Sequence, residues 1–468
     1  MSFTSNLNDI ITQNSNGLLG MHKSWRRVNL SKIATIQNGF PFESSRFSKS
    51  EGTPLIRIRD ITRGETATFY QGEFDASFLV QAGEILVGMD GDFHCAPWTG
   101  IPALLNQRVC KIIPDESQYL KSFLRYVLPG YLAAINAHTN SVTVKHLSSR
   151  TVADIPLPLP PLDEQRRIVA EIEKQFTRLD TGVAALQRVQ SKLKRYRASV
   201  LKSACEGRLV PTESELARAE GRDYESAKVL LQRILTERRE KWDGRGKYKE
   251  PAAPDIANLP ELPDGWVWTN IEQLMFLLRN GISTKPNATE GLPILRISSV
   301  RPMSVDMKEI RFLEASAADL SGYVLDEGDL LFTRYNGNPD YVGVCGAVPT
   351  QSTPLVHPDK LIRCKLISKM VHPRFVAIMA NAGASRSYMS KRIRTTAGQS
   401  GISGTDVKGL PIPLPPLAEQ ERIVEEVERR LSVVDELEAT VTANLRRATR
   451  LRQSILQQAF SGRLKRRT

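Results

Sequence analysis

The sequence predicts a mixed α/β fold with a pseudo-twofold internal repeat. Two globular α/β domains are each expected to be followed by a long helix, and the two helices are expected to pair as a coiled coil. The phrase PLPPLDEQRRIVAEIE, which begins at Pro158, returns as PLPPLAEQERIVEEVE at Pro413. Apolar residues at heptad spacing follow each copy, and short alternating apolar runs precede it. Self-similarity over this length indicates two copies of one structural unit.

The two copies stay in register from Pro161 and Pro416 to the end of the chain, without a gap. In each copy the prolines hold the backbone extended, and the acidic and helically spaced apolar residues that follow are typical of a helix start. Both copies later reach the tripeptide GRL, at Gly207 and Gly462. Identical residues at matching positions include Glu164/Glu419, Gln165/Gln420, Arg167/Arg422, Asp180/Asp435 and Arg197/Arg452.

The helix after each proline phrase carries an apolar stripe at positions a and d over about five heptads, which indicates a coiled coil. Two matched stripes in one chain favour pairing of the helices with each other over packing of each against a globule. About forty residues at a rise of 1.5 Å would make a rod about 60 Å long. The stripe comprises Val169, Ile172, Phe176, Leu179, Val183, Leu186, Leu193 and Val200, then Val424, Val427, Leu431, Val434, Val441, Leu445, Ala448 and Ile455.

The stretches before the helices match more faintly. Trp25 opens the first and Trp266 the second; TPLIRIRDI, ending at Ile61, corresponds to LPILRISSV, and AGEILVGMDG to EGDLLFTRYNG. Such short runs punctuated by glycine are typical of strands and turns. The predicted domains are a polar leader at 1–23, a first globule at 24–160, a first helix at 161–210, a helical and Pro-rich connector at 211–265, a second globule at 266–415 and a second helix at 416–468.

The connector is expected to contain an amphipathic helix in ESAKVLLQRILTERREKW. The apolar face of that helix is expected to consist of Val229, Leu230, Ile234 and Leu235.

The net charge of +13 and the pI near 9.5 favour a polyanionic partner, although charge that serves only solubility is the alternative. A composition of 41% apolar and 25% charged residues is ordinary for a soluble globular protein. No stretch offers the roughly 20 consecutive apolar residues of a membrane span. Five widely spaced cysteines indicate neither a disulfide framework nor a metal site, so a reducing cytoplasm is the expected location.

No catalytic constellation is evident. The sequence lacks a GxxxxGK[ST] phosphate loop, and its six histidines are scattered without a neighbouring ligand set. GNPDYVG, which contains Asn338, shares only part of the Asn-Pro-Pro-aromatic motif of amino-methyltransferases. The sequence therefore predicts a binding protein with no catalytic residue, metal or cofactor of its own.

Polar and basic side chains in the loops of both globules are candidates for contact with DNA. Asn, Gln and Arg pair with base edges, and cations pair with phosphate. Arg57 and Arg59 are expected to point the same way from one strand, with Arg296 on the matching strand. Ordinary solvent exposure is the alternative for each loop. The candidates are Arg57, Arg59, Asp60, Asp90, Asp92, His94, Thr139, Asn140 and Lys145 in the first globule, and Arg296, Arg334, Tyr335, Asn336, Asn338, Arg394, Thr395, Gln399 and Ser400 in the second.

The order of globule, PLPPLxEQ phrase, heptad helix and GRL, given twice, resembles the specificity subunit of type I restriction-modification systems. The resemblance covers residues 24–468. It implies that the globules are target recognition domains, each reading one half of a split DNA sequence. It also implies that the two helices pack as an antiparallel coiled coil, which sets the gap between the halves. It also implies two adenine-N6 methyltransferase subunits and motor and nuclease subunits as partners. S-adenosylmethionine, ATP and magnesium would belong to those partners.

Under this resemblance the repeated polar residues of the helices are expected to dock the partner subunits. They are Glu164, Gln165, Arg167, Arg197, Glu419, Gln420, Arg422 and Arg452. The basic cluster around Arg197 would suit either phosphate or an acidic partner protein. Two other classes remain open: a DNA-binding protein that acts without a methyltransferase, and a coiled-coil assembly protein whose charge serves another anion. The bases recognised do not follow from the sequence, because loop residues do not map onto bases by a simple code.

Overall fold

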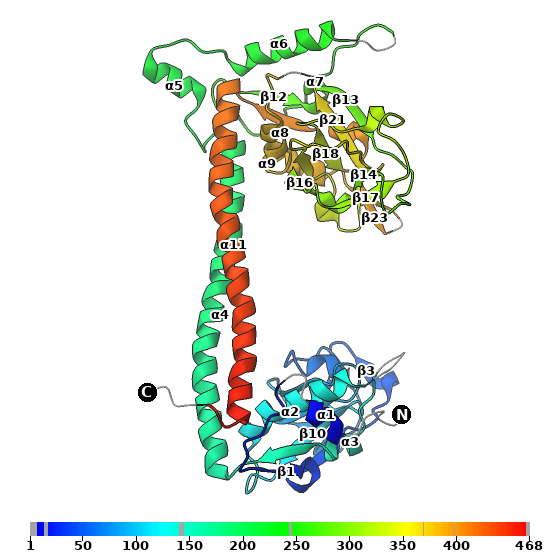
Figure 1. Ribbon diagram of the computed structural model, residues 1–468, viewed down its shortest axis with the longest axis vertical. Coiled ribbons are helices and arrows are strands. Elements are labelled where there is room, and N and C mark those ends of the chain that lie inside the picture. The colour runs from blue at the N-terminus through cyan, green and yellow to red at the C-terminus, as the bar shows by residue number, and fades with distance from the viewer. Residues whose placement is uncertain are drawn as a thin grey trace. The chain divides into compact units, whose positions relative to one another are not determined.

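The computed structural model describes residues 7–13, 17–139, 145–242, 246–367, 369–396 and 398–464. The chain divides into two compact units, unit 1 (Met1–Arg188 with Val441–Thr468) and unit 2 (Val189–Thr440). The long helices α4 (Leu162–Cys205) and α11 (Leu417–Phe460) contribute residues to both units (Figure 1). Globules 1 and 2 below are the strand-containing parts of units 1 and 2. Within the described ranges, no helix is long and apolar enough to cross a membrane.

Globule 1 begins and ends on one antiparallel strand pair, in which Val28 of β1 lies opposite Leu157 of β11. Its central sheet has the order β2-β10-β7-β8, and a second sheet has the order β3-β5-β4-β9-β6. The strands are β1 (Arg26–Asn29), β2 (Ala34–Asn38), β3 (Phe47–Ser48), β4 (Thr53–Ile56), β5 (Phe69–Tyr70), β6 (Leu79–Val80), β7 (Ile85–Gly88), β8 (Cys95–Pro97), β9 (Ala103–Leu105), β10 (Val109–Pro114) and β11 (Pro156–Leu159). The helices are α1 (Leu7–Gln13), α2 (Lys121–Ala137) and α3 (Ser149–Ala153).

Globule 2 repeats this plan with additions. Its first and last strands pair in the same way, with Thr269 of β12 opposite Ile412 of β24. The central sheet has the order β13-β21-β18-β20-β16-β15, beside the pair β14-β17 and the three-stranded sheet β19-β23-β22. The strands are β12 (Val267–Asn270), β13 (Met275–Asn280), β14 (Leu292–Leu295), β15 (Val300–Arg301), β16 (Met303–Val305), β17 (Ile310–Leu313), β18 (Leu330–Thr333), β19 (Tyr335–Asn336), β20 (Cys345–Ala347), β21 (Leu361–Leu366), β22 (Arg394–Thr396), β23 (Gln399–Gly401) and β24 (Pro411–Leu414). The helices are α7 (Ile271–Leu274), α8 (Pro373–Ala380), α9 (Gly383–Ser390) and α10 (Gly404–Lys408).

The long helices pack against each other within each unit. In unit 1 the core joins Ile172 and Phe176, from the first part of α4, to Ile455 and Phe460 near the end of α11. In unit 2 the core joins Val200, near the end of α4, to residues in the first part of α11, including Leu431. In both units, therefore, the start of one helix meets the end of the other.

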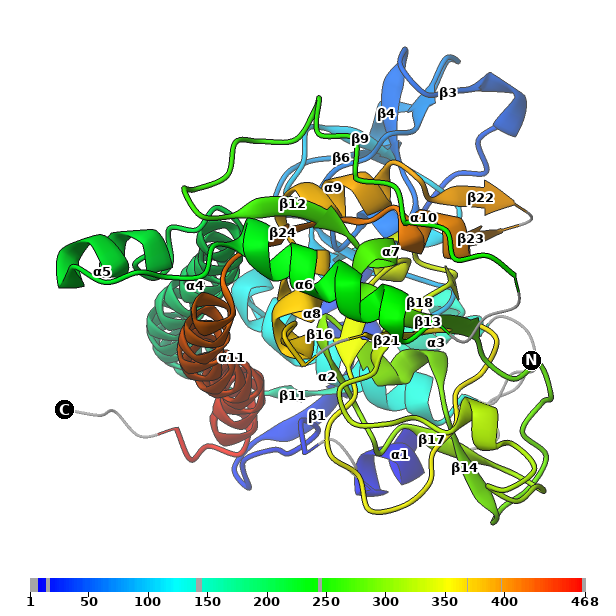
Figure 2. The ribbon, with the colours of Figure 1, turned by 90° about the horizontal axis from the view of Figure 1, so that it is seen from above.

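The connector contributes α5 (Glu213–Glu220) and α6 (Ala227–Glu240) to unit 2 (Figure 2). The buried side chains of α6 are Ala227, Leu230 and Ile234. The expected apolar face was wrong at Val229, which is 52% exposed, because the buried positions follow a 3–4 spacing that begins at Ala227. The leader is more than a polar tail, since Ile10 of α1 and Leu19 lie in the core of unit 1.

Candidate functional site

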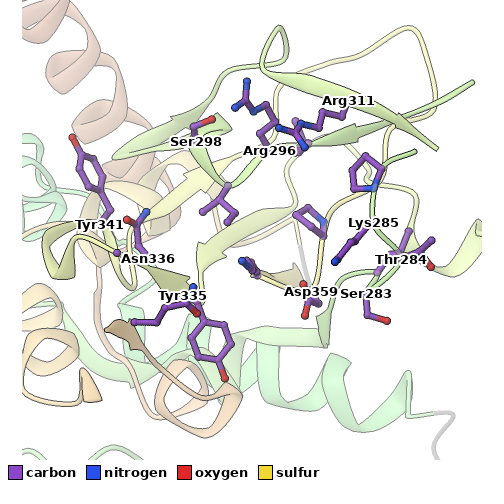
Figure 3. A pocket seen from close by; sticks show the side chains of 18 of the residues that line it. Ser283, Thr284, Lys285, Arg296, Ser298, Arg311, Tyr335, Asn336, Tyr341 and Asp359 are labelled. Atoms are coloured by element: carbon purple, nitrogen blue, oxygen red, sulfur yellow. The ribbon is translucent and has the colours of Figure 1, made fainter. Parts of the chain in front are cut away.

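Globule 2 contains a hollow of about 860 Å³ (Figure 3). Five cationic side chains line it, and Asp359 is the single carboxylate among its lining residues. Only the Arg296 guanidinium has an ion pair described in the structure, with Glu309 Oε2 at 3.6 Å. The hollow therefore has a positive balance that suits an anionic ligand. Its cations are Lys285, Arg296, Arg301, Arg311 and Lys360.

Separate elements bring these groups together. Arg296 directly follows β14 and precedes a 3₁₀ turn, where its backbone N–H donates to Ser299 Oγ at 2.9 Å. Arg311 lies on β17, and the two arginine side chains lie near each other on the same side of the hollow in Figure 3. Lys285 follows β13, and Lys360 immediately precedes β21.

The polar rim of this hollow contains four of the candidates from the sequence. Tyr335 and Asn336 form β19, and Asn338 and Gln399 also line the hollow. The Asn338 Oδ1 accepts the backbone N–H of Asp340 at 3.0 Å, which caps the next turn. These amides and the phenol can donate and accept hydrogen bonds, as a reader of base edges must.

Globule 1 contains a hollow of about 430 Å³ that is lined by Arg57, Arg59 and Arg108, with no carboxylate among its lining residues. The expected strand placement of Arg57 and Arg59 was wrong. β4 ends at Ile56, and Ile58–Asp60 forms a 3₁₀ turn. The turn forms because the Asp60 carboxylate accepts the Arg57 backbone N–H at 2.9 Å. Asp60 itself is only 3% exposed, so its role lies in holding this turn.

The two hollows occupy the same place in the repeat. The Gly39 N–H donates to Val109 O at 3.0 Å, and at the matching positions Gly281 N–H donates to Leu361 O at 3.2 Å. Likewise, Gln107 N–H donates to Phe40 O at 3.0 Å, and Asp359 N–H donates to Ile282 O at 2.8 Å. These bonds match Gln107 with Asp359 and the next residues, Arg108 and Lys360. Arg57 matches Arg296 because each donates its backbone N–H to a side chain three residues on.

Glycine is required where the two loops of each hollow meet. A Cβ atom at Gly39 would lie 2.0 Å from Asn106 O, and one at Gly281 would lie 2.2 Å from His357 O. Both distances are far below any real carbon–oxygen contact. The close approach of these backbones therefore depends on the missing side chain.

Beside the first hollow, the loop after β7 is tied to the end of α2. The Lys145 ammonium donates to Asn136 Oδ1 at 3.0 Å, and Asn136 Nδ2 donates to Gly91 O at 2.6 Å. Asp90 contacts the His146 imidazole at 2.6 Å and the Arg108 guanidinium at 3.5 Å. The structure thus brings the candidates Asp90 and Lys145 close to the hollow.

The remaining candidates of globule 1 lie elsewhere. Asp92 and His94 contact each other at 3.8 Å on the same loop, and the Thr139 hydroxyl donates to Ile135 O at 2.8 Å within its own helical turn. None of these three lines the described hollow. Asn140 lies outside the described residues.

Four candidates of globule 2 do not line the hollow either. Thr395 and Ser400 form a cross-strand hydroxyl pair at 2.8 Å, and Ser400 is only 2% exposed. Arg394 is exposed on β22. The Arg334 guanidinium lies 4.8 Å from the centre of the Tyr335 ring, and its Nη1 donates to Asp359 O at 3.4 Å. Arg334 therefore contacts two lining residues, Tyr335 and Asp359, without lining the hollow itself.

The repeated glutamines of the proline phrases are internal, which corrects their expected role in partner docking. Gln165 is 0% exposed; its Nε2 donates to Gln118 O and Pro160 O, and its Oε1 accepts Leu120 N–H. Gln420 is also 0% exposed and bonds equivalent backbone groups, including His372 N–H at 2.9 Å. Each glutamine therefore joins the start of its long helix to the globule before it.

The repeated glutamates bind the tryptophans that open the globules. The Trp25 indole donates to Glu164 Oε2 at 3.0 Å, and the Trp266 indole donates to Glu419 Oε1 at 2.8 Å. Glu419 is 0% exposed, so it too is not accessible to a partner. Burial raises the pKa of the Glu419 carboxyl, partly opposed by hydrogen bonds from Glu213 N–H and the Trp266 indole.

The four arginines expected to dock partners also make contacts within the chain. Arg197 pairs with Asp435 and Glu438, and Arg452 pairs with Asp180. The Arg422 guanidinium contacts Glu213 Oε2 at 2.7 Å. Arg167 contacts Glu164 at 3.3 Å and has a side chain that is 52% exposed.

Several lining residues were missed at the sequence level, namely Lys285, Arg301, Arg311, Lys360 and Arg108. Arg108 and Lys360 could have been found by aligning the strands that they precede, VCKIIP and LIRCKL. Arg311 carried no such signal. It lies on β17, which pairs with β14 as β5 pairs with β4, but β5 is only Phe69–Tyr70 and offers no matching arginine. Among the residues with described positions, no three His, Cys, Asp or Glu side chains gather as metal ligands.

Comparison with known proteins adds independent information. Residues 22–187 match the family model described as type I restriction modification DNA specificity domain. The EcoBI specificity subunit of Escherichia coli is 35% identical over 478 residues, covering 99% of this chain and 91% of that protein. The EcoKI specificity subunit of Escherichia coli strain K12 is 30% identical, covering 94% and 89%.

A solved structure shares the fold. It is described as the structural basis of complex assembly and conformational transition of the type I R-M system. It matches with a TM-score of 0.53 at 19% identity, over 95% of this chain and 99% of that one.

Proposed function

This chain belongs to the family of type I restriction enzyme specificity subunits, and from this premise we propose that it reads a split, asymmetric DNA target, one half-site with each globule. The observation that carries the proposal is the pair of matched cationic hollows. Both stand at the same place in the repeat, both combine arginines with amide or hydroxyl groups, and their linings differ. Matched sites with different linings suit two half-sites of different sequence.

The two long helices are proposed to set the distance between the half-sites. Within each unit the start of one helix packs against the end of the other, which supports an antiparallel pair. If the repeated helices pair antiparallel, as proposed, their globules would be related by a twofold axis. The strands of DNA are also antiparallel, so each globule could face its half-site in the same manner. The number of helical residues would then determine the spacer.

The partners that the family implies are DNA, methyltransferase subunits and restriction subunits. We place docking of two methyltransferase subunits on the exposed faces of the long helices, since the buried Gln165, Gln420 and Glu419 are occupied inside the chain. The chain itself would have no catalytic step. Adenine methylation and ATP-driven restriction would take place in the partners, which would bind S-adenosylmethionine, ATP and magnesium.

The test is methylome sequencing of cells that express this chain together with its methyltransferase, compared with cells that lack only this chain. A split adenine motif that disappears with the chain is the expected result. If the methylome is unchanged, the proposal fails, and recovery of DNA bound to the purified chain would then test action as a DNA-binding protein without a methyltransferase. Inserting one helical segment in both long helices should lengthen the spacer; an unchanged spacer would contradict the ruler role.

A further inference from the structure

At some matching positions the two hollows have side chains of the same kind, and at others the side chains differ. These two groups of positions suggest two different roles. Building on the proposed function, we propose that the cations present at matching positions of both hollows, Arg57/Arg296 and Arg108/Lys360, hold DNA phosphates. We propose further that the matching pair Gln107/Asp359 selects the base read in each half-site.

The shared cations start from equivalent backbone positions. Arg57 and Arg296 each follow the strand end and precede a 3₁₀ turn, and in each turn a side chain three residues on accepts their backbone N–H. Arg108 and Lys360 each precede an interior strand of their sheet. The Arg108 carbonyl accepts the Met89 N–H at 3.0 Å, and the Lys360 carbonyl accepts the Arg334 N–H at 2.8 Å. Two globules that read different sequences have only the sugar–phosphate backbone in common. A cation retained in both hollows therefore matches the common part of the ligand.

Gln107 and Asp359 form the contrasting pair. Their backbones are held by the same hydrogen bond, to Phe40 O and Ile282 O respectively, so the two side chains leave the loop at the same point. The chemistry at that point differs. An amide both donates and accepts and can pair bidentately with adenine, whereas a carboxylate accepts only and suits the exocyclic amine of cytosine.

The charge of Asp359 strengthens this assignment. It is the one carboxylate among the lining residues of a hollow with five cations. A carboxylate beside phosphate is repelled, so its presence there is unfavourable unless it accepts a hydrogen bond from the ligand. A base amine supplies that donor, and phosphate does not.

The experiment uses the full chain in complex with its methyltransferase and two readouts. The motif is measured by methylome sequencing and by selection from a randomised DNA pool, and affinity is measured as a function of salt. Asp359→Gln should change or relax one base of a single half-site, reducing discrimination at that base about tenfold or more, with the other half-site unaltered. Gln107→Asp should change or relax one base of the other half-site. In each variant the unaltered half-site serves as the internal control for correct folding.

The shared cations should respond differently. Arg57→Gln and Arg296→Gln should weaken binding to every sequence, reduce the slope of log K against log salt by about one, and leave the motif unchanged. The inference is overturned if Asp359→Gln and Gln107→Asp lower affinity without altering any base, or if Arg57→Gln changes the motif. A wild-type complex that selects no split motif would instead refute the proposed function itself.

Discussion

Arg197 on α4 pairs with Asp435 on α11, and at the matching positions of the repeat Arg452 on α11 pairs with Asp180 on α4. The first pair lies in unit 2 and the second in unit 1. Arg197 also contacts Glu438 at 3.1 Å, so this guanidinium on α4 pairs with two carboxylates of α11. The same ion pair made once by each copy favours the antiparallel arrangement, because a parallel one would not bring these residues opposite each other.

Reversing this pair tests the arrangement. Arg197→Asp should lower the melting temperature of the chain, because it places three carboxylates together at a partly exposed site, at a cost of about 1 kcal/mol. Combining Arg197→Asp with Asp435→Arg should restore much of the loss. Thermal unfolding of both variants provides the measurement. Arg195→Asp, an exposed position on the same helix, is the matched control, and an equal loss there would show that the effect is general charge.

Removing the internal glutamine should loosen the junction between globule and helix. Gln420→Ala leaves buried backbone groups, His372 N–H among them, without their partner, at a cost of about 1–3 kcal/mol. Hydrogen exchange of the segment around His372 should accelerate strongly. Gln190→Ala, on the exposed surface of α4, should leave exchange there unchanged. Slow exchange retained in Gln420→Ala would contradict the joining role.

A buried ion pair should dominate the stability of globule 2. The Arg363 guanidinium contacts Asp329 Oδ2 at 2.6 Å, with side chains 5% and 1% exposed. Asp329→Ala leaves a buried cation and should destabilise the chain by about 3–5 kcal/mol. Asp326→Ala is the matched control, because Asp326 also contacts Arg363, at 3.0 Å, but is 55% exposed. Denaturant unfolding monitored for unit 2 should rank Asp329 well above Asp326.

The stability contributed by Glu426 should depend on pH. Hydrogen bonds from Arg429 and Arg430 lower the pKa of its carboxyl from 4.5 to about 2. Because the pKa of this carboxyl is lower in the folded state than in the unfolded state, its ionised form stabilises the fold above the unfolded-state pKa. That stabilisation is lost as pH falls from about 4.5 towards 2. The melting temperature of Glu426→Gln should therefore lie below that of the wild type at pH 6, and the gap should narrow below pH 4.5 and close only as pH falls through about 2. A gap that widens in acid would reverse the sign of this linkage.

Two glycines at the second hollow allow a test of whether close backbone packing is needed for DNA binding. Gly281→Ala should reduce affinity for DNA about tenfold or more, because the new methyl would meet the carbonyl of His357 and push the loops apart. Gly281 directly precedes the lining residue Ile282, whereas Gly337 itself lines the hollow, and a Cβ at Gly337 meets nothing within 4 Å. Gly337→Ala should bind as the wild type does. DNA titration of both variants decides, and equal losses would refute the packing argument.

The long helices were predictable because their signal is local and periodic. The helices begin at Leu162 and Leu417, one residue after the boundaries predicted at 161 and 416. The faint likeness of the globules was also sufficient to match Arg57 with Arg296. The prediction that Arg57 and Arg59 lie on the strand was wrong, because the Asp60 carboxylate caps the turn that follows β4 and so ends the strand.

The hollows were less predictable, because they assemble from segments far apart in sequence. Lys285, Arg296, Arg311 and Lys360 come from four separate elements, and no local pattern joins them. The docking expectation failed for a different reason. Identical residues in the two copies indicate a shared role, and for Gln165 and Gln420 that role is a joint within the chain.

Each globule starts and finishes on neighbouring strands, β1 beside β11 and β12 beside β24. A segment whose two ends leave side by side can be replaced by another with the same paired ends without stretching the flanking chain. The tryptophan–glutamate and glutamine contacts at this base use residues identical in both copies. If each globule reads one half-site, as proposed, recombination between related genes at these borders would exchange one recognition domain and leave the long helices unchanged, so that a new target sequence would arise in a single step.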